Sequence, residues 1–174
     1  MPADAPPAHP AAPRPAWAYL LRALWNVANL SSVLGLLIGV VGRARFRNGP
    51  RRLLLAEGYR FGFPPAGAFT VGSVVITRYT VDQLESWHPG TFDHEDVHAW
   101  QWSALMGLPY LPAYWVLCGW SWLRTGDPAS LNFFERQAGL ERGGYHERPV
   151  TNAGLTAIAR FLGARRTPAA PPKN

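Results

Sequence analysis

Cysteine is nearly absent from this chain of 174 residues, since Cys118 is the only one. A single cysteine cannot form a disulfide within the chain, which excludes a disulfide-stabilised scaffold and favours a reducing compartment. Cys118 lies in an apolar stretch between Leu117 and Gly119, where an inert buried thiol is expected rather than a nucleophile. A mechanism based on a cysteine–histidine pair is therefore not expected.

Charged residues are scarce as well, at 16% of the chain, and 17 basic residues against 11 acidic ones leave a net charge of +6. Lysine contributes only Lys173, and the densest basic group consists of arginines: Arg43, Arg45, Arg47, Arg51 and Arg52. No recognised nucleic-acid-binding motif accompanies them, so nucleic acid is not expected as a partner. Their position favours a solvated pair of strands, or attraction to anionic lipid beside an apolar segment.

One apolar stretch, Ala23–Val41, contains no charged residue. Its length is close to what a helix needs to cross a bilayer, and the arginines that follow would then place the rest of the chain on the cytoplasmic side. Asn26 and Asn29, together with two glycines, fit equally well a helix that packs against the domain or lies on a membrane surface. Both interpretations predict a protein of the cytoplasm or of the cytoplasmic face of a membrane.

The two ends of the chain are rich in proline and alanine. Residues 1–16 and 164–174 contain few side chains that could build a core, so both are expected to be disordered tails. Between them we expect an apolar helical segment at 17–42, with membrane association as an alternative, and one domain at 43–163.

Two segments have the composition of strands. Arg51–Arg60 contains a short apolar run, and Phe69–Thr77 is rich in β-branched residues, with Gly72 as a candidate bulge. The sequence Asn48-Gly49-Pro50 predicts a turn that suits a hairpin. These segments predict a small antiparallel sheet.

Helices are expected at Val81–Trp87, at the motif described next and, after a break near 107–109, from Leu111 onward. Five of the eight tryptophans fall in residues 100–122, which predicts that the last of these helices packs inside the domain without contact with lipid. The resulting fold class is α+β, with a small antiparallel sheet packed on three or four helices.

The densest chemistry of the chain lies at His94-Glu95-Asp96-Val97-His98. On a helix, two histidines four residues apart lie on one face, so both imidazoles can reach the same metal ion. Glu95 then lies beside that face, where a carboxylate can take a proton from water at the metal. Thr91 or Asp93 is expected to cap the start of this helix.

A catalytic zinc usually takes three protein ligands and leaves one position for water. The downstream candidates for the third ligand are Asp127, Glu135, Glu141, His146 and Glu147. Glu135 is favoured because it lies in a helical stretch with an aromatic pair, and because Ala138 would let that stretch approach the motif helix. The alternative is a surface carboxylate paired with Arg136 or Arg142.

The order of these elements resembles the gluzincin-type zinc metallopeptidases, and more narrowly the small bacterial minigluzincin-like proteins. The resemblance covers roughly residues 44–142. It rests on His94–His98, on Gln101 one turn further, and on the pattern Asn132-x-Phe134-Glu135-x-x-Ala138.

The resemblance implies a function. His94, His98 and Glu135 would bind Zn²⁺, and Glu95 would be the general base of a metallopeptidase that hydrolyses a peptide or protein substrate. The strand within Gly67–Thr77 would offer its edge to an extended peptide.

Two other functions are open. A zinc-stabilised, non-catalytic binding module would need no base at Glu95 and would close the fourth metal position with a protein ligand. A membrane-associated protein would depend chiefly on Ala23–Val41. The group that would stabilise an oxyanion is open among four candidates: Tyr110, Tyr114, Tyr145 and His146.

Overall fold

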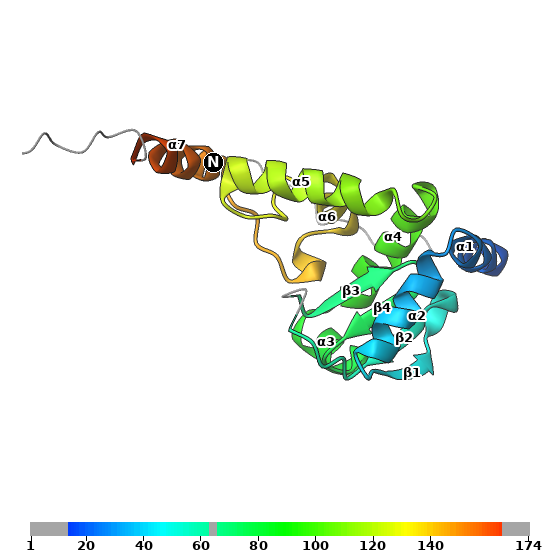
Figure 1. Ribbon diagram of the computed structural model, residues 1–174. Coiled ribbons are helices and arrows are strands. Elements are labelled where there is room, and N and C mark those ends of the chain that lie inside the picture. The colour runs from blue at the N-terminus through cyan, green and yellow to red at the C-terminus, as the bar shows by residue number, and fades with distance from the viewer. Residues whose placement is uncertain (1–13, 63–65, 165–174) are drawn as a thin grey trace, which may run out of the picture.

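The computed structural model describes residues 14–62 and 66–164. The helices are α1 (Ala16–Ala28), α2 (Ser31–Val41), α3 (Val81–Trp87), α4 (Thr91–Ala104), α5 (Tyr110–Thr125), α6 (Phe133–Ala138) and α7 (Ala153–Ala164). The strands are β1 (Arg45–Asn48), β2 (Leu54–Glu57), β3 (Ala68–Val71) and β4 (Val74–Thr77), and single 3₁₀ turns lie at η1 (Pro50–Arg52) and η2 (Glu141–Gly143). The α+β class predicted from the sequence is confirmed (Figure 1). The predicted tails at 1–16 and 164–174 lie largely outside the described residues.

The four strands form one sheet in the order β1-β2-β4-β3. The β1–β2 hairpin and the β3–β4 hairpin are antiparallel, but β2 and β4 pair in parallel, with Leu54 opposite Val74. The expectation of an antiparallel sheet is therefore wrong at this central pairing. Strand β3 lies at the edge of the sheet, and β4, antiparallel to β3, lies between β3 and β2 and runs parallel to β2. Gly72, at φ +63°, lies in the two-residue turn between β3 and β4 and not in a bulge.

Helix α2 covers one face of the sheet at very close range. A Cβ atom added to Gly35 would lie 2.6 Å from the carbonyl oxygen of Val71, and one added to Gly39 would lie 2.7 Å from the Phe46 ring. Only glycine leaves room for a helix backbone at this distance from a strand. The glycines of the apolar stretch therefore serve packing on the sheet.

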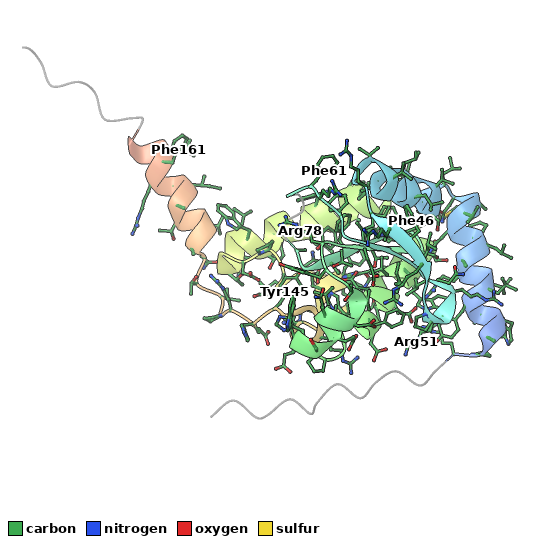
Figure 2. The ribbon with its side chains drawn as sticks, turned by 90° about the horizontal axis from the view of Figure 1, so that it is seen from below. Phe46, Arg51, Phe61, Arg78, Tyr145 and Phe161 are labelled. Atoms are coloured by element: carbon green, nitrogen blue, oxygen red, sulfur yellow. The ribbon has the colours of Figure 1, made fainter. Side chains whose placement is uncertain are left out.

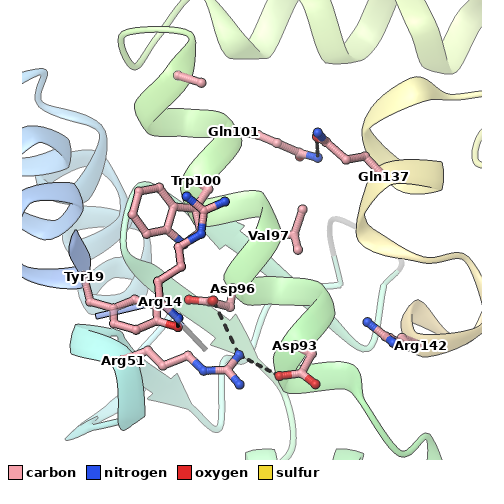
Figure 3. A pocket seen from close by; sticks show the side chains of 11 residues that line it. Arg14, Tyr19, Arg51, Asp93, Asp96, Val97, Trp100, Gln101, Gln137 and Arg142 are labelled. Carbon is pink, nitrogen blue, oxygen red and sulfur yellow. Dashed lines mark hydrogen bonds and ion pairs between the residues drawn. The ribbon is translucent and has the colours of Figure 1, made fainter. Parts of the chain in front are cut away.

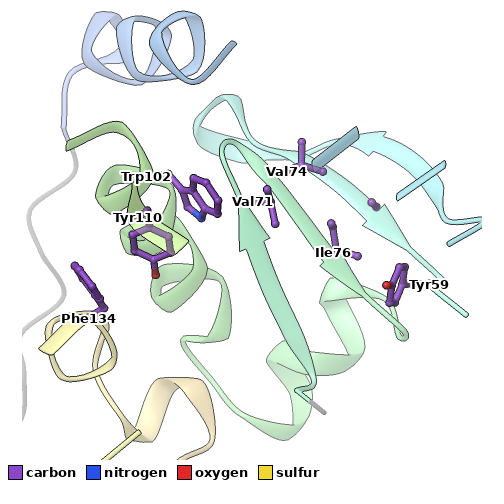
Figure 4. Close-up of a cluster of buried hydrophobic side chains, with 8 residues drawn as sticks. Tyr59, Val71, Val74, Ile76, Trp102, Tyr110 and Phe134 are labelled. Carbon is purple, nitrogen blue, oxygen red and sulfur yellow. The ribbon is translucent and has the colours of Figure 1, made fainter. Parts of the chain in front are cut away.

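The core has two parts, one on each face of the sheet. On the α2 side, Val74 and Ile76 pack with a cluster that continues past β3 to Trp102, Tyr110 and Phe134 (Figure 4). On the other face, a second cluster joins the sheet to α3 and α4: Leu53, Leu55, Val75, Val81 and Ala99. Helix α4 thus runs beside the edge strand β3 and contributes to both clusters.

The apolar stretch Ala23–Val41 is not one continuous helix. It breaks at Leu30, whose φ is +67°, and becomes the second half of α1 followed by α2. Among the residues that the structure describes, no single helix has the length and apolarity to cross a membrane; α1 and α2 meet these requirements only together, as a pair bent by 75°.

Helix α5 follows the predicted break and runs along one side of the molecule, and α7 extends beyond it, with Phe161 far from the sheet (Figures 1 and 2). Trp102 is buried, but Trp115, Trp120 and Trp122 are exposed. The prediction that the tryptophan-rich helix packs inside the domain is therefore wrong for these three side chains. Seven helices form in the described residues instead of three or four, partly because the 17–42 segment divides in two.

Charged side chains from neighbouring helices bind α4 at its start and at Asp96. Glu85 of α3 accepts hydrogen bonds from the backbone N–H groups of Gly90 and Phe92, so it caps the helix in place of the predicted Thr91 or Asp93. Arg22 of α1, whose side chain is fully buried, forms an ion pair with Asp96.

We expect Asp96→Ala to lower the free energy of unfolding by about 3–5 kcal/mol, because it leaves the buried Arg22 guanidinium without its counter-charge. Urea denaturation measures this change. The matched control is Glu147→Ala, which breaks the exposed ion pair with Arg136 and should cost less than about 1 kcal/mol. Equal effects of the two substitutions would contradict the structural role of the buried pair.

Candidate metal centre

Two helices bring three metal-ligating side chains together. His94 and His98 project from one face of α4, and Glu135 projects toward them from α6. The two Nε2 atoms are 3.0 Å apart, and Oε2 of Glu135 lies 3.2 Å from Nε2 of His94 and 3.7 Å from Nε2 of His98. These are the three residues that the sequence places in the metal site.

The geometry of the three atoms suits a tetrahedral zinc ion. Ligand atoms about 2.0–2.1 Å from a tetrahedral zinc lie about 3.3–3.4 Å from one another, and the three separations here spread around that value. Oε2 of Glu135 is buried, and the nearest nitrogen atoms to it are the two imidazole Nε2 atoms. A buried carboxylate oxygen is costly unless a cation, either a protonated imidazole or a metal ion, lies beside it.

Both imidazoles are oriented by hydrogen bonds at Nδ1, which leave Nε2 for a metal. Nδ1 of His94 lies 3.0 Å from the carbonyl oxygen of Gly139, and Nδ1 of His98 lies 2.7 Å from Oε1 of Gln101. The Gln101 amide nitrogen donates to the carbonyl of Phe134 and to Gln137, which fixes its oxygen toward His98. Gln101 therefore orients a ligand, as partners behind metal-binding histidines commonly do.

Glu135 is buried, with 2% of its surface exposed. Its other oxygen, Oε1, accepts a hydrogen bond from the Tyr114 hydroxyl of α5, and Asn132 caps the start of α6 by accepting from the N–H of Phe134. The alternative interpretation, a surface carboxylate paired with Arg136 or Arg142, is wrong for this fold, since Arg136 pairs with Glu147.

The electrostatics of the cluster keep Glu135 ionised and His98 protonated in the metal-free protein. Desolvation alone would lower the pKa of His98, but its hydrogen bond to Glu135, the Glu135 charge and the Glu95 charge outweigh it and raise the pKa to about 9. Desolvation alone would raise the pKa of Glu135, yet the hydrogen bonds from His94 and His98 lower it far below its usual range. A proton on His98 and a metal ion would therefore both compensate the charge of Glu135.

Glu95 lies beside the cluster but outside the ligand set. Its Oε2 accepts a hydrogen bond of 2.7 Å from the Thr70 hydroxyl of the edge strand β3. Its charge contributes to raising the pKa values of His98 and Tyr145, which shows that it lies near both. The structure therefore places Glu95 near the clustered side chains, and its role as general base stays a prediction.

The four candidate oxyanion stabilisers have different positions. The Tyr110 hydroxyl contacts His98 and Gln101, and the Tyr114 hydroxyl donates to Glu135, so both support ligands. His146 is exposed. The Tyr145 ring centroid lies 6.1 Å from that of His94, and burial together with the charges of Glu135 and Glu95 raises its pKa. Tyr145 thus remains a protonated donor near the metal site.

The segment after α6 covers the centre. A Cβ atom added to Gly143 would lie 2.5 Å from Cε1 and 2.8 Å from Nε2 of His94, so this backbone rests directly on the imidazole edge. His94 and His98 are consequently 2% and 6% exposed. No local signal in the sequence indicates that Gly143 contacts a residue of the cluster.

A cavity of about 410 Å³ runs along the flank of α4, between α1 and the α6–η2 segment (Figure 3). Its wall carries arginines, among them Arg14, Arg51 and Arg142, and the acidic side chains of Asp93 and Asp96. Gln101 belongs to this wall and also bonds to His98. His94, His98 and Glu135 do not line this cavity, so Gln101 lies between the cavity and the metal centre.

The other downstream candidates lie elsewhere. The Asp127 carboxylate accepts hydrogen bonds from Ala129 and Ser130 in the loop after α5, Glu147 pairs with Arg136, and Glu141 is exposed. Comparisons of the chain with protein-family models, with curated proteins and with solved structures find no match. The site is therefore interpreted from its geometry.

We expect Gly143→Ala to weaken zinc binding strongly, because the new methyl group would displace the His94 ring from the ligand position. Competition with a chromogenic chelator measures the zinc affinity. Gly119→Ala is the control, since a Cβ atom there meets nothing within 4 Å. Wild-type affinity in Gly143→Ala would show that the segment moves freely off the metal site.

Zinc binding should release about one proton at pH 7.5, because His98, with its pKa near 9, must become neutral to bind the metal. The apparent zinc affinity should rise with pH up to about 9. The free energy of unfolding of the metal-free protein should instead fall as pH rises. The raised pKa of His98 contributes stability that is fully present below about pH 6.5, and this contribution is lost as pH rises through about 9.

Titration calorimetry in buffers of different ionisation enthalpy counts the released protons, and urea denaturation at pH 6.5 and pH 9 measures the stability. His98→Gln is the control, in which the stability change over this window should disappear. Zinc binding without proton release would show that His98 is neutral in the metal-free protein.

Proposed function

We propose that this protein is a zinc-dependent hydrolase that cleaves peptide bonds. The observation that carries the proposal is the separation of the three ligating atoms, 3.0, 3.2 and 3.7 Å, with a buried carboxylate beside them that is not a ligand. A site that only needs a metal for stability has no use for this carboxylate. Zn²⁺ is proposed as the metal because two imidazoles and one carboxylate form a common ligand set of catalytic zinc.

When bound, zinc would supply Lewis acidity, which lowers the pKa of nearby water. Glu95 would accept a proton from a water molecule at the site and would later donate it to the leaving amine. Thr70 holds one oxygen of Glu95 and so orients the carboxylate. Tyr145, kept protonated by its raised pKa, donates a hydrogen bond to the oxyanion of the tetrahedral intermediate.

The substrate would approach the site beside β3, which is the edge strand nearest to α4. An exposed edge can pair with an extended peptide. One edge position is occupied, because the Trp102 indole donates a hydrogen bond of 2.8 Å to the carbonyl oxygen of Thr70. The short strand Ala68–Val71 would therefore hold only a short stretch of peptide backbone.

A non-catalytic, zinc-stabilised binding module is the second candidate. The observation that favours it is the cover formed by Gly143, which lies against His94 and leaves both histidines buried. A catalytic centre needs this segment to move so that substrate can enter. The two candidates differ in turnover and not in zinc content.

We expect Glu95→Gln to retain stoichiometric zinc and to lose hydrolysis by at least about 10²-fold, since the amide cannot accept the proton. A library of quenched fluorescent peptides measures turnover, and elemental analysis measures zinc. Asp82→Asn, at an exposed carboxylate of α3 outside the site, is the control and should be as active as the wild type. Stoichiometric zinc without turnover in the wild type would favour the binding module, and activity in Glu95→Gln would exclude the proposed base.

A further inference from the structure

Three helices of this protein bury polar or small residues and leave many of their large apolar side chains exposed. The buried residues of α1 include Arg22 and Asn26, those of α2 are two serines and two glycines, and those of α5 include Ser121 and Thr125. Twelve large apolar side chains between Trp17 and Val41 are exposed. A helix that faces water shows the opposite arrangement.

The apolar faces of the three helices meet. Gly107, in the turn between α4 and α5, lies against Asn29, in the turn between α1 and α2, where an added Cβ atom would come within 2.8 Å of the Asn29 carbonyl oxygen. Three large side chains at these two turns are exposed, namely Leu30, Met106 and Leu108. The exposed apolar residues of α1, α2 and α5 therefore adjoin at these two turns, and the exposed faces of the three helices are together named here the apolar surface.

No exposed charge interrupts the apolar surface. Between Pro15 and Gly42 the only charged residue is Arg22, which is buried, and none lies between Leu105 and Leu123. The exposed tryptophans Trp17, Trp25 and Trp120 are side chains typical of the boundary between lipid and water. Exposed apolar areas of this extent mark a binding surface.

The charges directly after α2 are positive. Arg43 and Arg45 follow directly after α2 and are exposed, and they make no ion pair with a carboxylate among the described residues. The whole chain carries a net charge of +6. Two copies of such a surface would repel each other, whereas a surface of anionic lipid would attract it.

We propose that the apolar surface of α1, α2 and α5 inserts into one leaflet of an anionic membrane, with Arg43 and Arg45 at the headgroups. The 75° bend between α1 and α2 suits helices that lie in the plane of the membrane. Helix α5, at 16 residues, is shorter than the roughly 20 residues of a spanning helix. The occupant of the surface is therefore lipid, independently of the proposed hydrolase function.

Flotation of the full-length, zinc-loaded protein with vesicles tests the proposal. We expect the protein to float with vesicles of phosphatidylcholine and phosphatidylglycerol. Replacing Leu37 and Val116, which are 57% and 70% exposed, in the double variant Leu37→Glu/Val116→Glu should lower the partition coefficient by at least about 100-fold. Replacing two charges in Arg43→Gln/Arg45→Gln should lower it roughly 30-fold on anionic vesicles and leave binding to pure phosphatidylcholine unchanged.

The matched control is Trp87→Glu on α3, because Trp87 is 53% exposed but lies outside the apolar surface; its binding should equal that of the wild type. Zinc content and circular dichroism confirm that each variant is folded. The proposal is overturned if the wild type does not float, or if Leu37→Glu/Val116→Glu floats like the wild type. It is also overturned if light scattering shows a wild-type dimer that this double variant dissociates while neither protein binds vesicles, since a second copy then covers the surface.

Discussion

The fold depends on the burial of polar groups along α4. Eight of its residues are buried, and six of them have polar or charged side chains. A buried polar group destabilises a protein unless it is bonded, so each element around α4 supplies a partner. Arg22 comes from α1, Thr70 from β3, Tyr110 from α5 and the Gly139 carbonyl from the end of α6. The positions of the surrounding elements thus satisfy the hydrogen bonds and the ion pair that the buried polar groups of α4 need.

Local patterns predicted the elements of the fold well. The 81–87 helix, the turn at Asn48, the break at 107–109 and the helix around Glu135 all depend on neighbouring residues, and all are present. The parallel pairing of β2 with β4 was not predictable in this way, because it joins two strands that are separated in the sequence by the whole of β3. The same holds for Glu85, which caps α4 from another helix.

The cluster of His94, His98 and Glu135 was predictable from spacing and residue type, but its surroundings were not. Two histidines one turn apart define a face, and Glu135 was the one carboxylate on a helix with apolar anchors. The roles of Tyr114 and Gly143 depend on which segments cross over α6 and α4, and no short-range pattern encodes that. The prediction that the tryptophans of α5 pack inside the domain was wrong for a related reason. Periodicity shows that a helix has two faces, but it does not show which face packs against the protein.

The hydrogen bonds and the ion pair between α1 and α4 also determine at what stage of protein synthesis α1 can pack. Arg22 bonds to a residue 74 positions further along the chain, and Asn26 donates to the carbonyl oxygen of Ala99, 73 positions further. During synthesis α1 therefore emerges long before its polar partners exist. Contacts of such long sequence separation slow folding. The N-terminal helices consequently cannot complete their packing until α4 has left the ribosome. Until then their apolar side chains are exposed and Arg22 lacks its ion-pair partner Asp96.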